Sequence, residues 1–477
     1  MKKQVFLQTY GCQMNDRDSE EVLGMLTAQG YEVSQKPEDA DVILLNTCSV
    51  RAHAEGRAFG KMGELSELKA GKPDLVLGII GCMAKLHEAA IFKRLPKVDL
   101  VAGPAELYDL PYLLAEIQER RQKSEVRGQR SEGARIVATG RAYRPLEQKP
   151  AGDFRKPGVS AFVTIMEGCD KVCTYCIVPT TRGQEISRPP EDIVNEINML
   201  VRAGYQEVTL LGQNVNSYGK RFPDGSGYRG PLGRLRLLEE DPDTLLDFPQ
   251  LLRLIDKRTT IPRVRFTTSH PFDATERLFE AIAECDSVCE WLHLPVQSGS
   301  NRILRAMRRG YTAEAYLRKV EALRRLVPEI ALTTDIIVGF PGETDEDFEA
   351  TERLVRDVRY ESAYIFKYSP RPGTAAAALE DDVPQEVKEA RNQRLLAIQE
   401  QLTLADHEAL AGQEHEILIE APGRHARQWF GRTRGHHGII VESDIPLIGQ
   451  TVRARITQAA SHTLFAALLP AAASGRA

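Results

Sequence analysis

Three cysteines, Cys169, Cys173 and Cys176, lie within eight residues of the chain at the spacing C-x3-C-x2-C. Cysteine thiolates hold the irons of a [4Fe–4S] cluster, and three thiolates on one loop leave the fourth iron free to bind another molecule. Two other interpretations stay open: three reduced thiols without a ligand, or part of a zinc site completed by a distant residue. The spacing favours the cluster, because a free iron lets an iron–sulfur enzyme contact its substrate or co-substrate.

A second set of three cysteines, Cys12, Cys48 and Cys82, is spread over the N-terminal part of the chain, each directly after an apolar run expected to be a strand. About one strand–helix unit separates each from the next. Because the carboxyl ends of parallel strands share one edge of a sheet, we expect the three thiols to converge there. Buried cysteines that serve only as small hydrophobic residues are the alternative. The repetition favours a second cluster, again with one open iron.

The elements that must position these cysteines are read from the apolar pattern. Residues 1–120 alternate strands and helices, which predicts an open, mostly parallel α/β sheet with strands near 5–10, 41–45, 75–80 and 98–101. Residues 121–157 are rich in Arg, Lys, Gly and Pro without periodicity, so we expect a basic linker. Such a linker is either a solvated connector or a contact for RNA phosphates.

Residues 158–397 alternate again, which predicts a partial (β/α)6 barrel with its chemistry at the carboxyl ends of the strands. The expected strands are 161–166, 207–212, 263–268, 291–296, 331–338 and 362–368.

Three features of this central region have no assigned role. The stretch 221–246 looks like a loop insertion of unreadable purpose, and Cys285 and Cys289 look like bystander thiols on one face of a helix. His293 falls in a strand pattern and is expected to be structural.

Residues 398–470 begin with the end of a helix and continue as short strands with glycine turns, near 415–419, 438–441, 451–456 and 463–467, which predicts a small five-stranded barrel. Trp429 and Phe430 stand among four arginines: Arg424, Arg427, Arg432 and Arg434. Arginines contact phosphates and an exposed ring stacks on a base, so RNA binding is one interpretation. A solvated loop beside a core tryptophan is the other.

The amino-acid composition limits the class of protein and its location. The 477 residues, 42% hydrophobic and 27% charged with a net charge of −5, describe an ordinary globular protein of two or three domains whose basic surface must be local. The first residues lack the apolar run of a signal peptide, and no run is long enough to span a membrane. We therefore expect a cytoplasmic protein whose cysteines are metal ligands or reduced thiols.

The stretch from Glu167 to Cys176, with Tyr175 between the second and third cysteines and the strand Ala161–Ile165 before it, resembles the signature of radical S-adenosylmethionine enzymes. The resemblance implies that the free iron is chelated by the amino and carboxylate groups of S-adenosylmethionine. It also implies that Tyr175 and Gln297 belong to the cofactor pocket. Gly212, Gln213 and Asn214 would occupy the place of the motif that contacts the methionine amino group, and no single side chain is assigned a catalytic role.

Three further segments carry a closer resemblance, to the methylthiotransferase branch of that family: Thr9–Asn15, Asn46–Arg51 and Gly81–Ala84. This branch carries a second [4Fe–4S] cluster on Cys12, Cys48 and Cys82. The C-terminal segment resembles the TRAM domain, an RNA-binding module.

Within the branch, Leu211–Tyr218 and Lys367–Thr374 are similar to the enzymes that add a methylthio group to C2 of N6-isopentenyladenosine at position 37 of tRNA. The resemblance implies that a radical from S-adenosylmethionine removes the C2 hydrogen, because that bond is too strong for acid–base chemistry. It implies as partners the anticodon loop of tRNA and a reduced flavodoxin or ferredoxin, and we expect a monomer. The alternatives are threonylcarbamoyladenosine in tRNA or an aspartate of a ribosomal protein as substrate.

Overall fold

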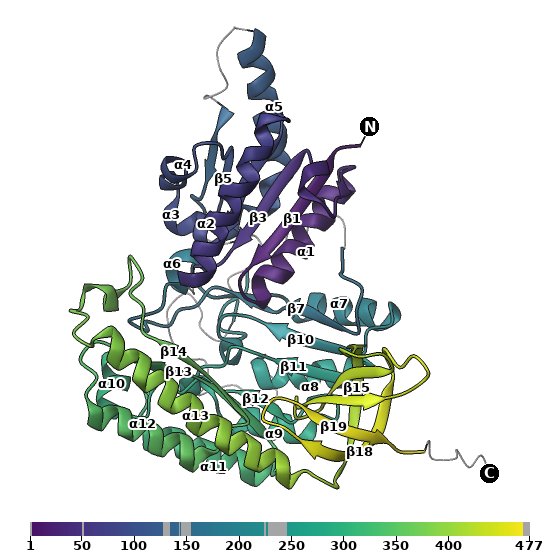
Figure 1. Ribbon diagram of the computed structural model, residues 1–477, viewed down its shortest axis with the longest axis vertical. Helices are drawn as coiled ribbons and strands as arrows, with labels where there is room; N and C mark the ends of the chain where they lie inside the picture. The colour runs from purple at the N-terminus through teal and green to yellow at the C-terminus, as the bar shows by residue number, and fades with distance from the viewer. Residues whose placement is uncertain are drawn as a thin grey trace.

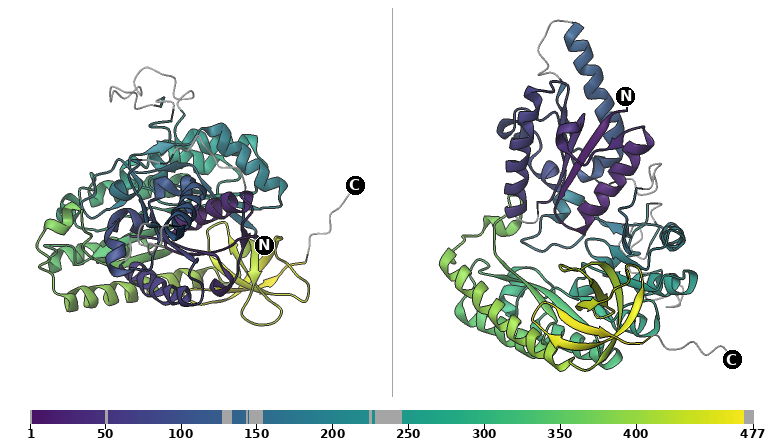
Figure 2. Two further views of the ribbon diagram at one scale, coloured as in Figure 1. Left: turned by 90° about the horizontal axis from the view of Figure 1, so that it is seen from above. Right: turned by 45° about the vertical axis from the view of Figure 1, so that its right-hand side comes forward.

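The computed structural model describes residues 2–49, 52–126, 134–142, 144, 154–223, 226–227 and 246–470. Figure 1 shows an N-terminal α/β domain, a central domain of strands and helices, and a small β-barrel at the C-terminal end. The views in Figure 2 show the N-terminal domain standing on the central domain and the β-barrel packed against the side of the central domain. Within the described residues, no helix is long and apolar enough to cross a membrane.

The N-terminal domain is built on a six-stranded sheet in which every neighbouring pair is parallel. Its strands, in spatial order, are β2 (Glu32–Val33), β1 (Gln4–Tyr10), β3 (Val42–Thr47), β4 (Val76–Gly81), β5 (Leu100–Ala102) and β6 (Ile136–Ala138). The helices are α1 (Gln13–Ala28), α2 (Ala52–Ser66), α3 (Cys82–His87), α4 (Ala90–Arg94) and α5 (Leu110–Val126).

Strand β3 shows why this sheet is covered on both faces. All six of its residues are buried, and successive side chains of a strand point to opposite faces. Val42 and Leu44 belong to the apolar cluster shared with α1 and α5, whereas Ile43 and Leu45 belong to the cluster shared with α2, α3 and α4. The continuous apolar run is therefore the sequence pattern of a central strand between two helix layers.

The basic stretch after α5 is not the strand-free connector expected from its composition. Residues 136–138 form β6, which pairs with β5 at the edge of the sheet. Arg144 is buried, and Arg155 donates a hydrogen bond to the carbonyl oxygen of Phe162. The sequence pattern did not reveal this strand, because an edge strand of three residues is too short to show the alternation of apolar and polar side chains.

The central domain holds six parallel strands in two groups of three, β11-β10-β7 and β12-β13-β14. A parallel bridge between Val264 and Val288 joins the groups, so the strands form a partial barrel, as predicted. These strands are β7 (Ser160–Thr164), β10 (Glu207–Leu211), β11 (Arg263–Phe266), β12 (Trp291–His293), β13 (Ala331–Val338) and β14 (Ser362–Lys367).

Helices cover the outside of this partial barrel, and one apolar cluster joins them to the strands (Figure 1). They are α7 (Pro190–Arg202), α8 (Phe248–Arg258), α9 (Glu276–Glu284), α10 (Asn301–Ala306), α11 (Ala313–Leu326), α12 (Asp345–Val358) and α13 (Gln385–Ala409). Most of the expected insertion at 221–246 lies outside the described residues.

The C-terminal domain is a closed five-stranded barrel in the order β15-β16-β17-β19-β18. Its strands are β15 (Glu414–Pro422), β16 (Gln428–Thr433), β17 (Gly438–Glu442), β18 (Thr451–Ala459) and β19 (Leu464–Leu468). The positions of four of these strands were predicted from the sequence. Strand β16 was missed because its arginines and aromatic residues suggested a loop.

Candidate active site

The central three cysteines lie on the loop between the short strand β8 (Met166–Glu167) and α6 (Val178–Arg182). Gly168 opens the loop at φ +76°, and a Cβ there would lie 2.0 Å from the carbonyl oxygen of Gln184. The backbone N–H of Cys169 donates to the carbonyl oxygen of Gly183 at 3.1 Å. Only glycine fits at the start of this loop, and the hydrogen bond to Gly183 holds the backbone of Cys169 in place.

Burial disfavours the charged form of two of these thiols, and a cation lies beside the third. Burial is the largest cause that raises the pKa of Cys169 to about 12 and that of Cys176 to about 11, and charge on a neighbouring cysteine contributes to each value. The Nη1 group of Arg309 donates to Cys173 Sγ at 3.4 Å. Metal ligation requires thiolates, and a cation stabilises closely spaced negative sulfurs. Three closely spaced thiols with a cation beside Cys173 therefore suit a cluster, because a bound metal would deprotonate its thiol ligands despite their raised pKa.

The other three cysteines meet at the carboxyl edge of the N-terminal sheet. Cys12 and Cys48 follow β1 and β3, and Cys82 follows β4 as the first residue of α3. The hydrogen bond with Cys48 lowers the pKa of Cys12 to about 6, against the effect of burial. Gly11 permits this approach, because a Cβ there would lie 2.7 Å from Cys48 Cβ. Convergence of the three thiols was predicted from the sheet alone.

Both sets of cysteines lie close to the junction of the first two domains. Arg182, six residues after Cys176, forms an ion pair with Asp18 at 2.6 Å and a hydrogen bond with the thiol of Cys82. On the other side of the junction, Gln13 accepts a hydrogen bond from Thr267 Oγ1 at 3.4 Å. Figure 1 shows α6 directly below the N-terminal sheet.

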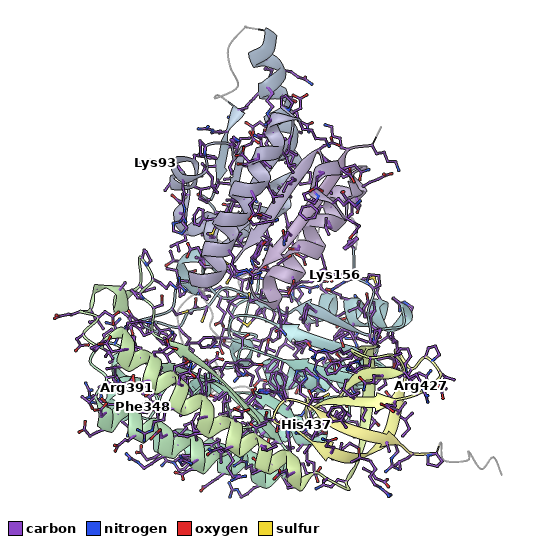
Figure 3. All side chains as sticks on the ribbon, viewed as in Figure 1. Lys93, Lys156, Phe348, Arg391, Arg427 and His437 are labelled. Atoms are coloured by element: carbon purple, nitrogen blue, oxygen red, sulfur yellow. The ribbon has the colours of Figure 1, made fainter. Side chains whose placement is uncertain are left out.

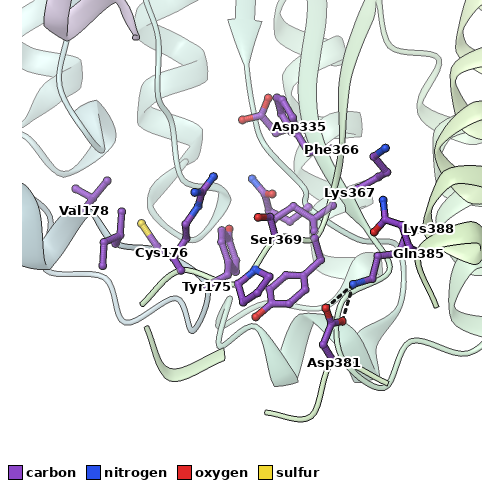
Figure 4. A pocket seen from close by; sticks show the side chains of 16 residues that line it. Tyr175, Cys176, Val178, Asp335, Phe366, Lys367, Ser369, Asp381, Gln385 and Lys388 are labelled. Atoms are coloured by element: carbon purple, nitrogen blue, oxygen red, sulfur yellow. Dashed lines mark hydrogen bonds and ion pairs between the residues drawn. The ribbon is translucent and has the colours of Figure 1, made fainter. Parts of the chain in front are cut away.

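A cavity of about 660 Å³ opens beside the central cysteine loop (Figure 4). Tyr175 and Gln297, both expected in the cofactor pocket, line it together with Cys176. Gln297 has a left-handed backbone, with φ +71°, fixed by hydrogen bonds to β13. Polar residues also line the cavity. Lys367 and Ser369 belong to the segment Lys367–Thr374 that carries the resemblance, whereas the sequence did not single out the others: Asp335, Asp381, Gln385 and Lys388.

The segment Gly212–Asn214 lies against the back of the cysteine loop. Gln213 Oε1 accepts a hydrogen bond from the N–H of Gly168 at 2.5 Å, and Asn214 Nδ2 donates to Asp273 Oδ2 at 2.7 Å. Gln213 Nε2 and Asn214 Oδ1 are buried without a hydrogen-bond partner among the described residues. Buried polar atoms call for partners, so these two atoms suit a bound polar ligand. The segment supports the loop, and its contact with a methionine amino group stays a prediction.

Models of three known families match successive parts of the chain. They are the uncharacterized protein family UPF0004 over residues 4–103, the radical SAM superfamily over residues 163–355, and the TRAM domain over residues 408–469.

Curated relatives match nearly the whole chain. The tRNA-2-methylthio-N(6)-dimethylallyladenosine synthase of Carboxydothermus hydrogenoformans is 44% identical over 96% of this chain and 97% of its own length. That of Moorella thermoacetica is 45% identical over 96% of both chains. The chain belongs to the family of the tRNA-2-methylthio-N(6)-dimethylallyladenosine synthases. As a member of this synthase family it is a radical S-adenosylmethionine enzyme, so the family predicted from the resemblance of the stretch Glu167–Cys176 is confirmed.

Solved structures with low sequence identity share the fold of this synthase family. The radical S-adenosylmethionine methyltransferase TsrM from Kitasatospora setae superposes with a TM-score of 0.55 at 16% identity, covering 79% of this chain and 77% of its own. The cobalamin-dependent radical enzyme OxsB gives 0.51 at 14% identity, covering 84% and 56%. The predicted α/β fold is confirmed.

A buried ion network beside the N-terminal cysteines is the main feature that sequence reasoning missed. Arg144 Nη2 binds Asp18 at 2.7 Å, and its Nη1 binds Glu21 at 3.1 Å and Glu167 at 3.0 Å. Burial opposes ionisation of Asp18, but Arg144 and Arg182 hold its pKa below the usual value. Arg17, Glu20, Arg155, Arg188 and Glu196 continue the network. These residues carry no sequence signal, because charged helix positions and basic linkers are usually solvated.

The residues regarded as bystanders are structural. Cys285 and Cys289 are buried, with 5% and 1% of their surface exposed. Because α9 ends at Glu284, neither lies in a helix, and the prediction that both share one helix face was wrong. His293 Nδ1 lies 2.9 Å from Thr333 Oγ1 within the barrel.

Three of the four arginines near Trp429 form ion pairs within the protein. Arg434 pairs with Glu290 and Arg432 with Glu420, whereas Arg427 pairs with Asp444 at the surface. Arg424 and Arg427 are exposed. The basic surface that this barrel offers to RNA is therefore smaller than the sequence suggested.

Proposed function

We propose that this protein adds a methylthio group to C2 of N6-isopentenyladenosine at position 37 of tRNA. One observation carries the proposal: two sets of three thiols lie near one domain junction, and a cavity of about 660 Å³ lies beside the central set. The names of the curated relatives support this substrate.

In this proposal Cys169, Cys173 and Cys176 hold one [4Fe–4S] cluster, and Cys12, Cys48 and Cys82 hold the other. When bound, these groups and S-adenosylmethionine supply radical removal of the C2 hydrogen, sulfur for that carbon and the methyl group. Three protein ligands for each cluster would leave one iron of each cluster without a protein ligand.

The chain's own residues orient these groups. Gln213 fixes the start of the central loop through Gly168, and Arg309 donates to Cys173. Tyr175 and Gln297 wall the cavity in which we place S-adenosylmethionine. Asp335 lines the same cavity, and its carboxylate can accept hydrogen bonds from the hydroxyl or amino groups of S-adenosylmethionine.

The proposed activity also implies an RNA partner, a cellular location and an electron donor. We propose that the anticodon loop of tRNA approaches the domain junction, with exposed Arg424 and Arg427 available to its phosphates. We further propose a cytoplasmic monomer that receives electrons from a reduced flavodoxin or ferredoxin.

Mass spectrometry of tRNA nucleosides tests the substrate. A strain that lacks the gene is expected to lose 2-methylthio-isopentenyladenosine and to accumulate its unthiolated precursor, and the wild-type gene is expected to restore the product. A Cys169→Ala gene should not restore it. Loss of the methylthio derivative of threonylcarbamoyladenosine instead, or unchanged tRNA, would contradict the proposal.

Replacing Gln297 with alanine tests the cofactor cavity. We expect S-adenosylmethionine to bind about tenfold more weakly, the effect of one lost hydrogen bond of about 1.4 kcal/mol. Equilibrium dialysis against the labelled cofactor, on protein with both clusters loaded, measures the change. Gln393→Ala, on the exposed face of α13, is the matched control and should bind as wild type. Equal affinity in all three proteins would exclude Gln297 from the site.

A further inference from the structure

Three potential metal ligands meet where the C-terminal barrel packs on the central domain. Glu361 lies just before β14, His407 lies on α13, and His437 lies in the turn between β16 and β17. Figure 3 labels His437 at this junction. One ligand atom from each of the three lies within 4.8 Å of the other two. Nothing in the proposed tRNA chemistry uses these residues.

Hydrogen bonds to the far nitrogen of each ring orient both imidazoles. His407 Nδ1 lies 2.7 Å from the carbonyl oxygen of Ala460, which can only accept, so Nδ1 carries the proton. His437 Nδ1 lies 2.9 Å from Thr433 Oγ1. In both rings Nε2 is left facing Glu361. Histidines that bind metals have this arrangement, in which the second nitrogen is tied to a carbonyl or hydroxyl group.

The spacing of the ligand atoms fits a tetrahedral ion. Glu361 Oε1 lies 2.8 Å from His407 Nε2, and Oε2 lies 3.2 Å from His437 Nε2. Ligands on one tetrahedral zinc, with bonds of about 2.1 Å, lie roughly 3.3 Å apart. Both distances to Glu361 are within about 0.5 Å of this spacing, and the three ligand atoms lie within 4.8 Å of one another, so movement of the side chains alone would let them surround an ion.

A position for a further ligand is open on one side. Glu361 and His437 line a cavity of about 520 Å³. His415 lines the same cavity, and its Nε2 is buried without a hydrogen-bond partner among the described residues. The fourth position of a tetrahedral zinc ion can be taken by a water molecule from this cavity.

We propose that Glu361, His407 and His437 bind one Zn²⁺ ion, which joins the C-terminal barrel to the central domain. Two imidazoles and one carboxylate suit zinc, whereas magnesium and calcium prefer oxygen ligands alone. Without the ion, the 2.8 Å contact requires a proton between His407 and Glu361. Zinc binding replaces that proton and leaves the remaining hydrogen bonds in place.

Other contacts also hold the barrel against the central domain, so variants of this site can be compared with wild type in folded protein. Arg434 Nη2 donates to the carbonyl oxygen of Val288 at 2.7 Å, and Arg265 donates to the carbonyl oxygens of Thr433 and Arg434 at 2.7 Å. A His437→Gln variant is therefore expected to fold with its barrel in place. His462→Ala, an exposed histidine of the same barrel, is the matched control.

Protein with both iron–sulfur clusters loaded is incubated anaerobically with zinc, passed through a desalting column and analysed by mass spectrometry for metals. Wild type and His462→Ala are expected to retain one zinc ion per chain more than His437→Gln and Glu361→Gln. Zinc bound to cysteines in incompletely loaded protein cancels in this comparison, because all four proteins share the same thiols.

Thermal unfolding provides the second measurement. Zinc should raise the unfolding midpoint of wild type and of His462→Ala but not that of His437→Gln, because an ion that binds only the folded state stabilises it. Equal zinc retention in wild type and His437→Gln, or no zinc retained by wild type, would overturn the site whether or not the protein modifies tRNA.

Discussion

Replacing Cys48 with alanine is expected to lower the iron content from about eight to about four per chain, because one of the two four-iron clusters loses a ligand. Cys48 is 3% exposed and makes the hydrogen bond that lowers the pKa of Cys12. The variant should still cleave S-adenosylmethionine to 5′-deoxyadenosine, since the central loop is untouched, but tRNA methylthiolation should fall below detection. Iron analysis and chromatography of both products measure these outcomes.

The matched control for this experiment is Cys289→Ala. Cys289 is equally buried, at 1% exposure, and lies in the central domain away from both sets of thiols. It should retain full iron and both activities. If Cys48→Ala bound as much iron as wild type, or Cys289→Ala lost half, the assignment of the N-terminal cluster would be wrong.

Replacing Arg144 with methionine is expected to destabilise the protein by about 3–5 kcal/mol, because removing one partner of a buried ion pair leaves uncompensated charge. Its side chain is 2% exposed and contacts the carboxylates of Asp18, Glu21 and Glu167. The midpoint of thermal or urea-induced unfolding should fall accordingly. Methionine keeps most of the side-chain volume, so the loss reports on charge.

Arg427→Met provides the comparison at the surface. Arg427 pairs with Asp444, and both side chains are mostly exposed, at 64% and 76%. Exposed pairs contribute about 1 kcal/mol or less, so this variant should unfold close to wild type. Equal midpoints for the Arg144 and Arg427 variants would mean that the network at the domain junction contributes little to stability.

The fold was predictable where the sequence pattern reports burial directly. The apolar run of β3 showed a strand covered on both faces, and the six strands of the central domain alternate with helices at regular spacing. Strands β6 and β16 were not predictable. The first has three residues within a basic stretch, and the second is mostly half-buried and carries Trp429, Phe430 and Arg432.

Some residues of the candidate site were also predictable from the sequence, and others were not. The convergence of Cys12, Cys48 and Cys82 followed from the rule that parallel strands end at one edge. The network around Asp18 and Arg144 did not follow, since a charge pair distant in sequence becomes visible only when the fold brings the partners together. The ligand set of Glu361, His407 and His437 was hidden for the same reason.

The position of Arg182 bears on how the protein matures. This residue belongs to the central domain, yet it contacts Asp18 and the thiol of Cys82 in the N-terminal domain. The N-terminal domain therefore receives part of the wall of its proposed cluster site only after the two domains dock. We expect iron delivery to the N-terminal domain to follow interdomain docking during biogenesis, so that a fragment ending before the central domain acquires iron poorly.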